Sequence, residues 1–341
     1  MLENIEKLRE RAKLPVFVYG ESNLRYYTGV AYLGGGLLID KENILLANDM
    51  EMAHKVNEFI GVFKIKENTI SDLLKVLKER KIKRLGVELP LVSYALYKKF
   101  QAKGIKLVDA SKIMSDIREI KTEEEIRKIS KACELADKAM KEVVSAIRPG
   151  ASERQIRTRA MSVLTECEDV AFSFIIASGP NSEYTHVYPS DRRISSGELI
   201  IVDLGFKVDG YCSDLTRTFC INPSPAQKAF YSTILEAQKR AAVAAIPGIE
   251  CDKVRGVVED FFRKDDLLDY WKYSLGHGVG LEVHEPPYFF KGAKEKLKNN
   301  MTFTLEPGLH IPGTGGIRIE DTLLLDKKPI KLTDFEYSIE P

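Results

Sequence analysis

The chain has 341 residues, of which 44% are hydrophobic, so it is long enough to bury sizeable cores and to form two domains. Its 51 basic and 50 acidic side chains nearly cancel, which argues against nucleic acid or a membrane surface as a partner. No apolar run reaches membrane-spanning length, the first ten residues are amphipathic and charged, and the five cysteines lack CxxC spacing. We therefore expect a cytoplasmic protein without a disulfide framework or a thiolate zinc site.

Apolar strands and helical stretches alternate through residues 15–107, which predicts an α/β domain with a mixed sheet. Runs at 16–19, 37–40 and 85–88 have strand composition, and residues 71–81 are expected to form a helix. A helix near 111–119 leads into the second domain. We place the domains at residues 1–113 and 114–341.

The second domain has an α+β pattern. Two helices are expected at about 123–147 and 152–166, followed by a strand at 171–177, further strands, and a helical pair across 225–263. The C-terminal part is rich in strands. We expect a curved sheet that carries the candidate site on its inner face.

Two aspartates are predicted to meet in a first hairpin. The strand-like runs 198–206 and 211–219 flank the turn signal at 207–210. If the chain folds about Val208 and Asp209, Asp203 lies opposite Asp214, and opposed Cβ atoms are about 4.5–5.5 Å apart. Half-buried like charges at such a distance are costly, and a cation between them removes the cost.

Two glutamates are predicted to meet in a second hairpin. Runs at 302–306 and 317–324 flank a glycine-rich segment, and folding about Gly313 sets Glu306 opposite Glu320. One acidic pair could be an ordinary solvated surface, and Arg217 or Arg318 could neutralise it. Strand alternation places only Arg318 on the face of its neighbouring glutamate, and one arginine cannot neutralise four carboxylates.

Histidines accompany both hairpins. His277 lies among three glycines in five positions, which permit close backbone approach, and it could complete a site for two divalent metal ions. His284 would face the other way in a straight strand, unless the glycines bend it. His186 follows the strand at 171–177 in a polar loop. His310 could face the same cavity as Glu306, although a histidine at the end of a strand is the favoured interpretation.

These segments together resemble a known enzyme family. The ordered motifs at 202–205, 214–218, 276–285, 305–308 and 318–321 are similar to those of pita-bread metallopeptidases, specifically Xaa-Pro dipeptidases (prolidases). The segments 121–132 and 149–153 also match, so the resemblance runs from about residue 121 to the C-terminus and more loosely covers the N-terminal part. The chain departs from the family at Thr185, where a proline is common, and at His310, where a tyrosine or another bulky residue is expected.

The resemblance implies a pita-bread catalytic domain with a curved sheet, preceded by a smaller α/β domain of creatinase type. It implies that Asp203 chelates one metal ion, that Asp214 and Glu320 bridge both ions, and that His277 and Glu306 complete the other. Such ligands suit Mn²⁺ or Co²⁺, while Zn²⁺ and Fe²⁺ are also compatible. Two ions of this kind can activate a shared water as hydroxide.

The resemblance also implies roles for residues around the metals. Glu306 would act as proton shuttle, and His186 and His284 would stabilise the oxyanion. Arg318 would either bind the terminal carboxylate of the substrate or orient a metal ligand, and we favour the second role because it adjoins Glu320.

The expected function is hydrolysis of the imide bond of Xaa-Pro dipeptides, in a protein that resemblance implies is a homodimer. The substrate is then a small peptide with proline in the second position. One alternative is an Xaa-Pro aminopeptidase that acts on longer peptides, and another is a non-catalytic protein of the same fold that binds a peptide or partner. A methionine aminopeptidase would not require the first 110 residues, and a creatine amidinohydrolase uses no metal.

Overall fold

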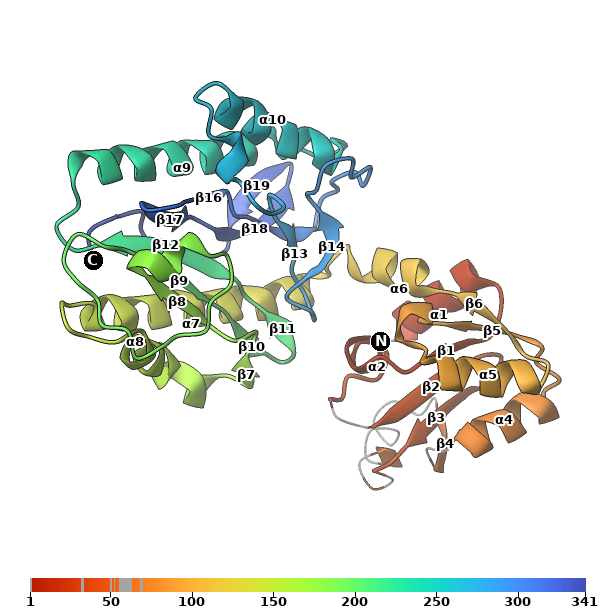
Figure 1. Ribbon diagram of the computed structural model, residues 1–341. Coiled ribbons are helices and arrows are strands. Elements are labelled where there is room, and N and C mark those ends of the chain that lie inside the picture. The colour runs from red at the N-terminus through yellow and green to blue at the C-terminus, as the bar shows by residue number, and fades with distance from the viewer. Residues whose placement is uncertain (1, 32–33, 50, 52, 55–62, 68–69) are drawn as a thin grey trace. The chain divides into compact units, whose positions relative to one another are not determined.

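The computed structural model describes residues 2–31, 34–49, 51, 53, 54, 63–67 and 70–341. Its contacts divide the chain into two compact units, Met1–Arg118 and Glu119–Pro341 (Figure 1). The domain limits of 1–113 and 114–341 stay a prediction.

The N-terminal unit is built on a six-stranded mixed sheet. Its strands are β1 Val16–Val18, β2 Gly35–Ile39, β3 Asn43–Ala47, β4 Phe63–Glu67, β5 Arg84–Val87 and β6 Lys106–Asp109. Its helices are α1 Leu2–Ala12, α2 Glu21–Thr28, α4 Ile70–Glu79, α5 Tyr94–Ala102 and α6 Ser111–Arg118, with a 3₁₀ turn η1 at Leu89–Leu91. The strand order is β4-β3-β2-β1-β5-β6, and β1 is antiparallel to β2 but parallel to β5, which confirms the predicted mixed sheet.

Hydrophobic spacing explains how helices cover this sheet. Leu73, Val76 and Leu77 lie on one face of α4 and are buried, as expected for an amphipathic helix. They pack with Phe100 of α5 in a core that also contains side chains of β1, β2 and β5.

The C-terminal unit contains four α-helices, which are α7 Glu123–Ala146, α8 Glu153–Ala160, α9 Pro225–Ala244 and α10 Cys251–Arg263. It also contains the 3₁₀ segments η2 Met161–Glu166, η3 Gly179–Glu183 and η4 Leu268–Tyr270. Capping boxes begin three of the α-helices, at Thr122, Ser152 and Ser224. The helix expected at 152–166 is therefore present, but it changes from α to 3₁₀ geometry after Ala160.

Between the helix pairs lie short strands that form several small sheets. They are β7 Asp169–Val170, β8 Ile175–Ser178, β9 Leu199–Leu204, β10 Phe206–Val208, β11 Tyr211–Cys212, β12 Leu215–Cys220, β13 His277–Gly278, β14 Glu285–Tyr288, β15 Thr302–Leu305, β16 Gly308–Ile311, β17 Gly315–Arg318, β18 Asp321–Asp326 and β19 Lys328–Lys331. Helices α7 and α8 cover one side of this layer, and α9 and α10 cover the other (Figure 1). The strands thus form a layer between the two helix pairs.

The register predicted for the first hairpin is wrong by two residues. The turn lies at Asp209 and Gly210, which both have positive φ (49° and 85°), so Asp203 pairs with Thr216 rather than with Asp214. Asp-Gly suits such a turn, whereas the β-branched Val208 resists positive φ. A shift by two keeps every side chain on its face, so Asp203 and Asp214 still line the same cavity.

The register predicted for the second hairpin is confirmed on both sides of the glutamates. Thr302–Leu305 pair with Asp321–Leu324, and Gly308–Ile311 pair with Gly315–Arg318. The ladder is interrupted between these halves, because the Glu306 N–H donates to the carbonyl of Leu275 and the Glu320 N–H donates to that of Thr216. The single strand expected at 317–324 is therefore two strands, β17 and β18.

Candidate metal centre

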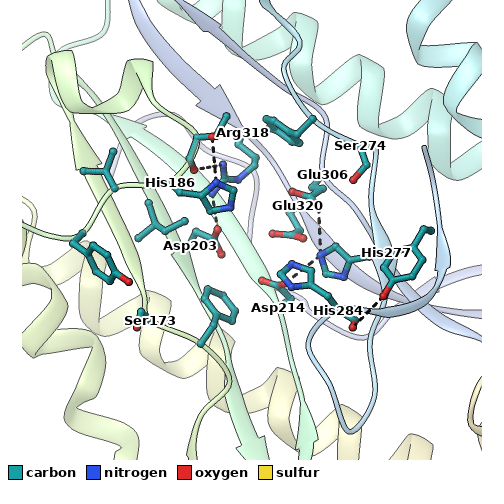
Figure 2. Close-up of a pocket in the computed structure, with 17 residues that line it drawn as sticks. Ser173, His186, Asp203, Asp214, Ser274, His277, His284, Glu306, Arg318 and Glu320 are labelled. Carbon is teal, nitrogen blue, oxygen red and sulfur yellow. Dashed lines mark hydrogen bonds and ion pairs between the residues drawn. The ribbon is translucent and has the colours of Figure 1, made fainter. Parts of the chain in front are cut away.

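One cavity in the C-terminal unit, with a volume of about 430 Å³, collects the acidic side chains and histidines (Figure 2). Asp203 comes from β9, Asp214 directly precedes β12 and His277 begins β13. Glu306 follows β15 and Glu320 precedes β18. All the site residues predicted from sequence line this cavity: Asp203, Asp214, His277, Glu306, Glu320, His186, His284 and Arg318.

Three of the predicted ligands form a tight group. Asp214, His277 and Glu320 each offer one donor atom, and these atoms all lie within 4.8 Å of one another. Glu306 adjoins the group, since its Oε1 is 3.3 Å from His277 Nε2. Asp203 stands at the side, where its Oδ2 forms a 2.5 Å ion pair with the Arg318 guanidinium.

Several buried oxygens in this group lack partners. Asp203 Oδ1, Asp214 Oδ1 and Glu320 Oε1 accept no hydrogen bond from the residues that the structure describes. A buried carboxylate oxygen without a partner is costly, whereas oxygen donors are the preferred ligands of hard divalent cations. The donor set therefore fits divalent metal ions.

Electrostatics support the same conclusion. Burial raises the pKa of Asp214 and of Glu320 well above the ordinary range, and neighbouring carboxylates raise both further. Burial also raises the pKa of Asp203, although Arg318 opposes the rise. Without a cation these groups favour the neutral form, and a bound cation favours the carboxylate form.

Arg217 supports the backbone beside Glu320 and does not line the cavity. Its fully buried guanidinium donates to the carbonyl oxygens of Glu320 (2.6 Å) and Thr216 (3.0 Å), and it pairs with Asp321 at 2.8 Å. Asp321 also accepts hydrogen bonds from Gln238, Thr333 and Tyr337. The two arginines thus bind different carboxylates, and neither pairs with Asp214 or Glu320 among the described residues.

Sequence reasoning missed two polar residues beside the predicted ligands. The Thr216 hydroxyl donates to Glu320 Oε2 at 2.7 Å, and its even spacing from Asp214 on one strand could have indicated this. Tyr273 lines the cavity with its ring centre 5.8 Å from the Arg318 guanidinium. Tyr273 lies outside the regular strands, so no periodic signal pointed to it.

His284 reaches His277 by a hairpin and not by a bent strand. Strands β13 and β14 pair antiparallel, and the two imidazole rings lie 4.1 Å apart between centres. Desolvation lowers the pKa of His284 to about 4, and the neighbouring His277 contributes to the decrease. His284 is therefore neutral at physiological pH and has one ring N–H to donate.

His186 and His310 have different environments. His186 is exposed on the cavity wall, and its Nδ1 lies 3.2 Å from the Thr185 hydroxyl. His310 is buried in β16, outside the cavity lining, with Nδ1 at 2.8 Å from the carbonyl oxygen of Ser182. The alternative that His310 faces the cavity is thus wrong.

Comparison with known proteins places the chain in a family. Residues 127–327 match the model of metallopeptidase family M24, and residues 2–120 match that of the Creatinase/Prolidase N-terminal domain. The chain therefore belongs to metallopeptidase family M24 and is a peptidase. Its fold is the pita-bread domain preceded by a creatinase-type α/β domain, as expected from the resemblance.

Particular relatives span nearly the whole chain. The chain is 37% identical over 346 residues to the Xaa-Pro dipeptidase of Pyrococcus furiosus, with 97% of each covered. It resembles the solved Xaa-Pro dipeptidase from Bacillus anthracis with a TM-score of 0.93 and 29% identity, covering 99% of both chains. It also resembles the X-Pro aminopeptidase from Thermotoga maritima, with a TM-score of 0.86 and 29% identity over 97% of this chain and 99% of that one.

The described part of the chain contains no helix with the length and apolar character needed to cross a bilayer.

Proposed function

We propose that this chain hydrolyses Xaa-Pro dipeptides at two divalent metal ions held by the residues predicted from sequence: Asp203, Asp214, His277, Glu306 and Glu320. The observation that carries the proposal is the set of three buried carboxylate oxygens, without partners among the described residues, in the cavity that His277 also lines. Divalent ions bound there would lower the pKa of a water molecule and polarise the scissile carbonyl. Mn²⁺ or Co²⁺ is the proposed occupant, because oxygen donors predominate.

The cavity has a wall that suits the substrate. Apolar and aromatic side chains also line the cavity, and they are contributed by Phe172, Ile175, Val187, Tyr188 and Tyr288. A proline ring is apolar and has no N–H to satisfy when it is acylated, so burial against such a wall is favourable. The carboxylates and histidines remain available to the peptide backbone.

Three side chains are placed to handle protons and charge. The Glu306 side chain is 15% exposed and that of the neighbouring His277 only 5%, so Glu306 can exchange protons with substrate and solvent. Neutral His284 can donate a hydrogen bond to a developing oxyanion, and His186 can do so from the opposite wall (Figure 2). Arg318 is proposed to orient Asp203, to which it is paired, rather than to bind the substrate carboxylate.

The test is release of proline from Met-Pro and Leu-Pro by protein loaded with Mn²⁺. Wild type should be active, Asp214→Ala should lose at least about 100-fold in kcat/KM, and the exposed control Asp326→Asn should match wild type. Equal release by wild type and Asp214→Ala would contradict the proposal. Metal analysis of the same samples tests the alternative of a non-catalytic binding protein, because that alternative predicts far less than one metal ion per chain.

An Xaa-Pro aminopeptidase is the second candidate, favoured by the similarity to the Thermotoga maritima structure. The two candidate functions differ in whether the peptide substrate must end at proline. Comparing kcat/KM for Leu-Pro with that for Leu-Pro-Gly separates them, because a dipeptidase loses activity on the longer peptide. A cytoplasmic location and a homodimer remain predictions from the sequence and the resemblance.

A further inference from the structure

His186 lies in a loop whose two ends are held together by one buried carboxylate. The loop leaves β8 at Ser178, passes through η3 and returns at Ser190. The carboxylate of Glu153, which is fully buried at the start of α8, accepts hydrogen bonds from both ends of the loop. The donors are Ser178 (N and Oγ, both 2.8 Å), Asn181 (Nδ2, 3.0 Å) and Ser190 (N at 3.0 Å and Oγ at 2.7 Å).

The middle of the loop is held by the hairpin of β16 and β17. His310 Nδ1 lies 2.8 Å from the Ser182 carbonyl oxygen, and the Gly316 N–H donates to the Ser182 hydroxyl at 3.0 Å. The Arg318 guanidinium donates to the carbonyl of Thr185 at 3.3 Å, directly before His186. A Cβ atom at Gly316 would lie 2.1 Å from the Ser182 carbonyl oxygen, so this close approach requires glycine.

His310 binds the loop with a defined ring atom. A carbonyl oxygen only accepts hydrogen bonds, so Nδ1 carries the proton and donates to Ser182. The other nitrogen, Nε2, is buried without a partner among the described residues, which favours the neutral ring. The ring packs edge-on against Tyr273, with centres 5.8 Å apart, so its orientation is restricted from a second side.

We propose that His310 is a positioning residue for His186, holding the loop through the Ser182 carbonyl so that His186 faces the metal-binding side chains across the cavity. The contact joins residues 128 positions apart in sequence. The inference rests on the proposed peptidase function for its catalytic consequence. The contact itself is independent of that function.

Two substitutions separate the hydrogen bond from the packing of the ring. His310→Phe keeps an aromatic ring against Tyr273 but removes the donor, whereas His310→Asn places an amide N–H near the position of Nδ1. We expect His310→Phe to lower kcat/KM for Leu-Pro about 3- to 10-fold, mainly in kcat, and His310→Asn to restore most of the loss.

A double-mutant cycle with His186→Ala tests whether His310 acts through His186. When His186 is absent, His310→Phe should change kcat/KM less than twofold, because the group that His310 positions is gone. An equal fold-loss in both backgrounds would overturn the proposal, since it would show an effect independent of His186. Thermal unfolding with Mn²⁺ should show the same metal-induced shift in wild type and His310→Phe.

Hydrogen exchange provides a readout that does not need activity. Amides of residues 183–187 should exchange faster in His310→Phe than in wild type, and His310→Asn should remain close to wild type. Ser182→Ala keeps the carbonyl oxygen that His310 binds but loses the hydroxyl's bonds with the Gly316 N–H (3.0 Å) and the Gly179 carbonyl (2.6 Å), so its exchange reports those two contacts and not the one with His310. Unchanged exchange in His310→Phe would overturn the positioning role, whereas inactive wild type with faster exchange in His310→Phe would instead contradict the proposed function.

Discussion

Replacing Asp214 by asparagine should stabilise the metal-free protein while abolishing its response to metal. Asp214 and Glu320 have donor atoms within 4.8 Å of each other. Two unit charges at that distance repel by about 3.5 kcal/mol at an effective dielectric constant of 20. Asparagine removes one charge and keeps the shape, so up to this free energy is recovered when both carboxylates are ionised.

The sign of the pH dependence follows from the raised pKa of Asp214. The folded protein without metal binds a proton at Asp214 more tightly than the unfolded chain does. The free energy of unfolding is therefore higher at low pH and decreases as pH rises. The stabilisation by Asp214→Asn should therefore grow as pH rises above the ordinary aspartate value of 3.8. At alkaline pH it should be largest.

The assay is calorimetric unfolding at pH 8 after removal of metal by a chelator. At about 2.1 cal/mol/K per residue, the C-terminal unit of about 220 residues unfolds with an entropy near 0.46 kcal/mol/K, so 3.5 kcal/mol corresponds to about 8 °C as an upper limit. Saturating Mn²⁺ at 100 times Kd should stabilise wild type by about 2.7 kcal/mol and leave Asp214→Asn almost unchanged.

The matched control is Asp326→Asn, the same chemical change at an exposed position of β18. It should alter neither the metal-free Tm nor the response to Mn²⁺. The reasoning would be refuted if metal-free Asp214→Asn were less stable than wild type at pH 8, or if it kept the full metal-induced shift.

Two further predictions concern buried groups outside the metal-binding set. Arg217→Met should lower the free energy of unfolding of the C-terminal unit by about 3–5 kcal/mol in urea, because it leaves Asp321 charged and buried without its ion-pair partner. A decrease below about 1 kcal/mol would contradict this prediction. Burial lowers the pKa of His310 from 6.5 to about 4, so the folded protein resists protonation and stability should fall as pH decreases from 6.5 toward 4. The shift corresponds to about 3 kcal/mol, and His310→Phe should flatten the unfolding profile over that window; an unchanged slope would exclude His310 as its source.

Local chemistry made much of the layout predictable. Thr122 and Glu125 specify the start of a helix, because the side chain of each accepts a hydrogen bond from the backbone N–H of the other. Strand alternation placed Asp203 and Asp214 on one face even though the predicted register was wrong, since a shift by two residues preserves the face. The register of the second hairpin follows from its glycine-rich turn, and it was predicted correctly.

Contacts between distant segments were beyond such local reasoning. The pairing of Arg318 with Asp203 joins residues 115 positions apart, and the bond from His310 to Ser182 joins residues 128 apart. The position of His284 against His277 depended on a hairpin in a segment whose glycines allow many conformations. The sequence by itself determined which residues offer ligands and which face of a strand they occupy, because these follow from side-chain chemistry and a period of two. Only the tertiary structure decided which arginine meets which carboxylate and what holds the His186 loop, because those contacts arise when separately folded segments pack together.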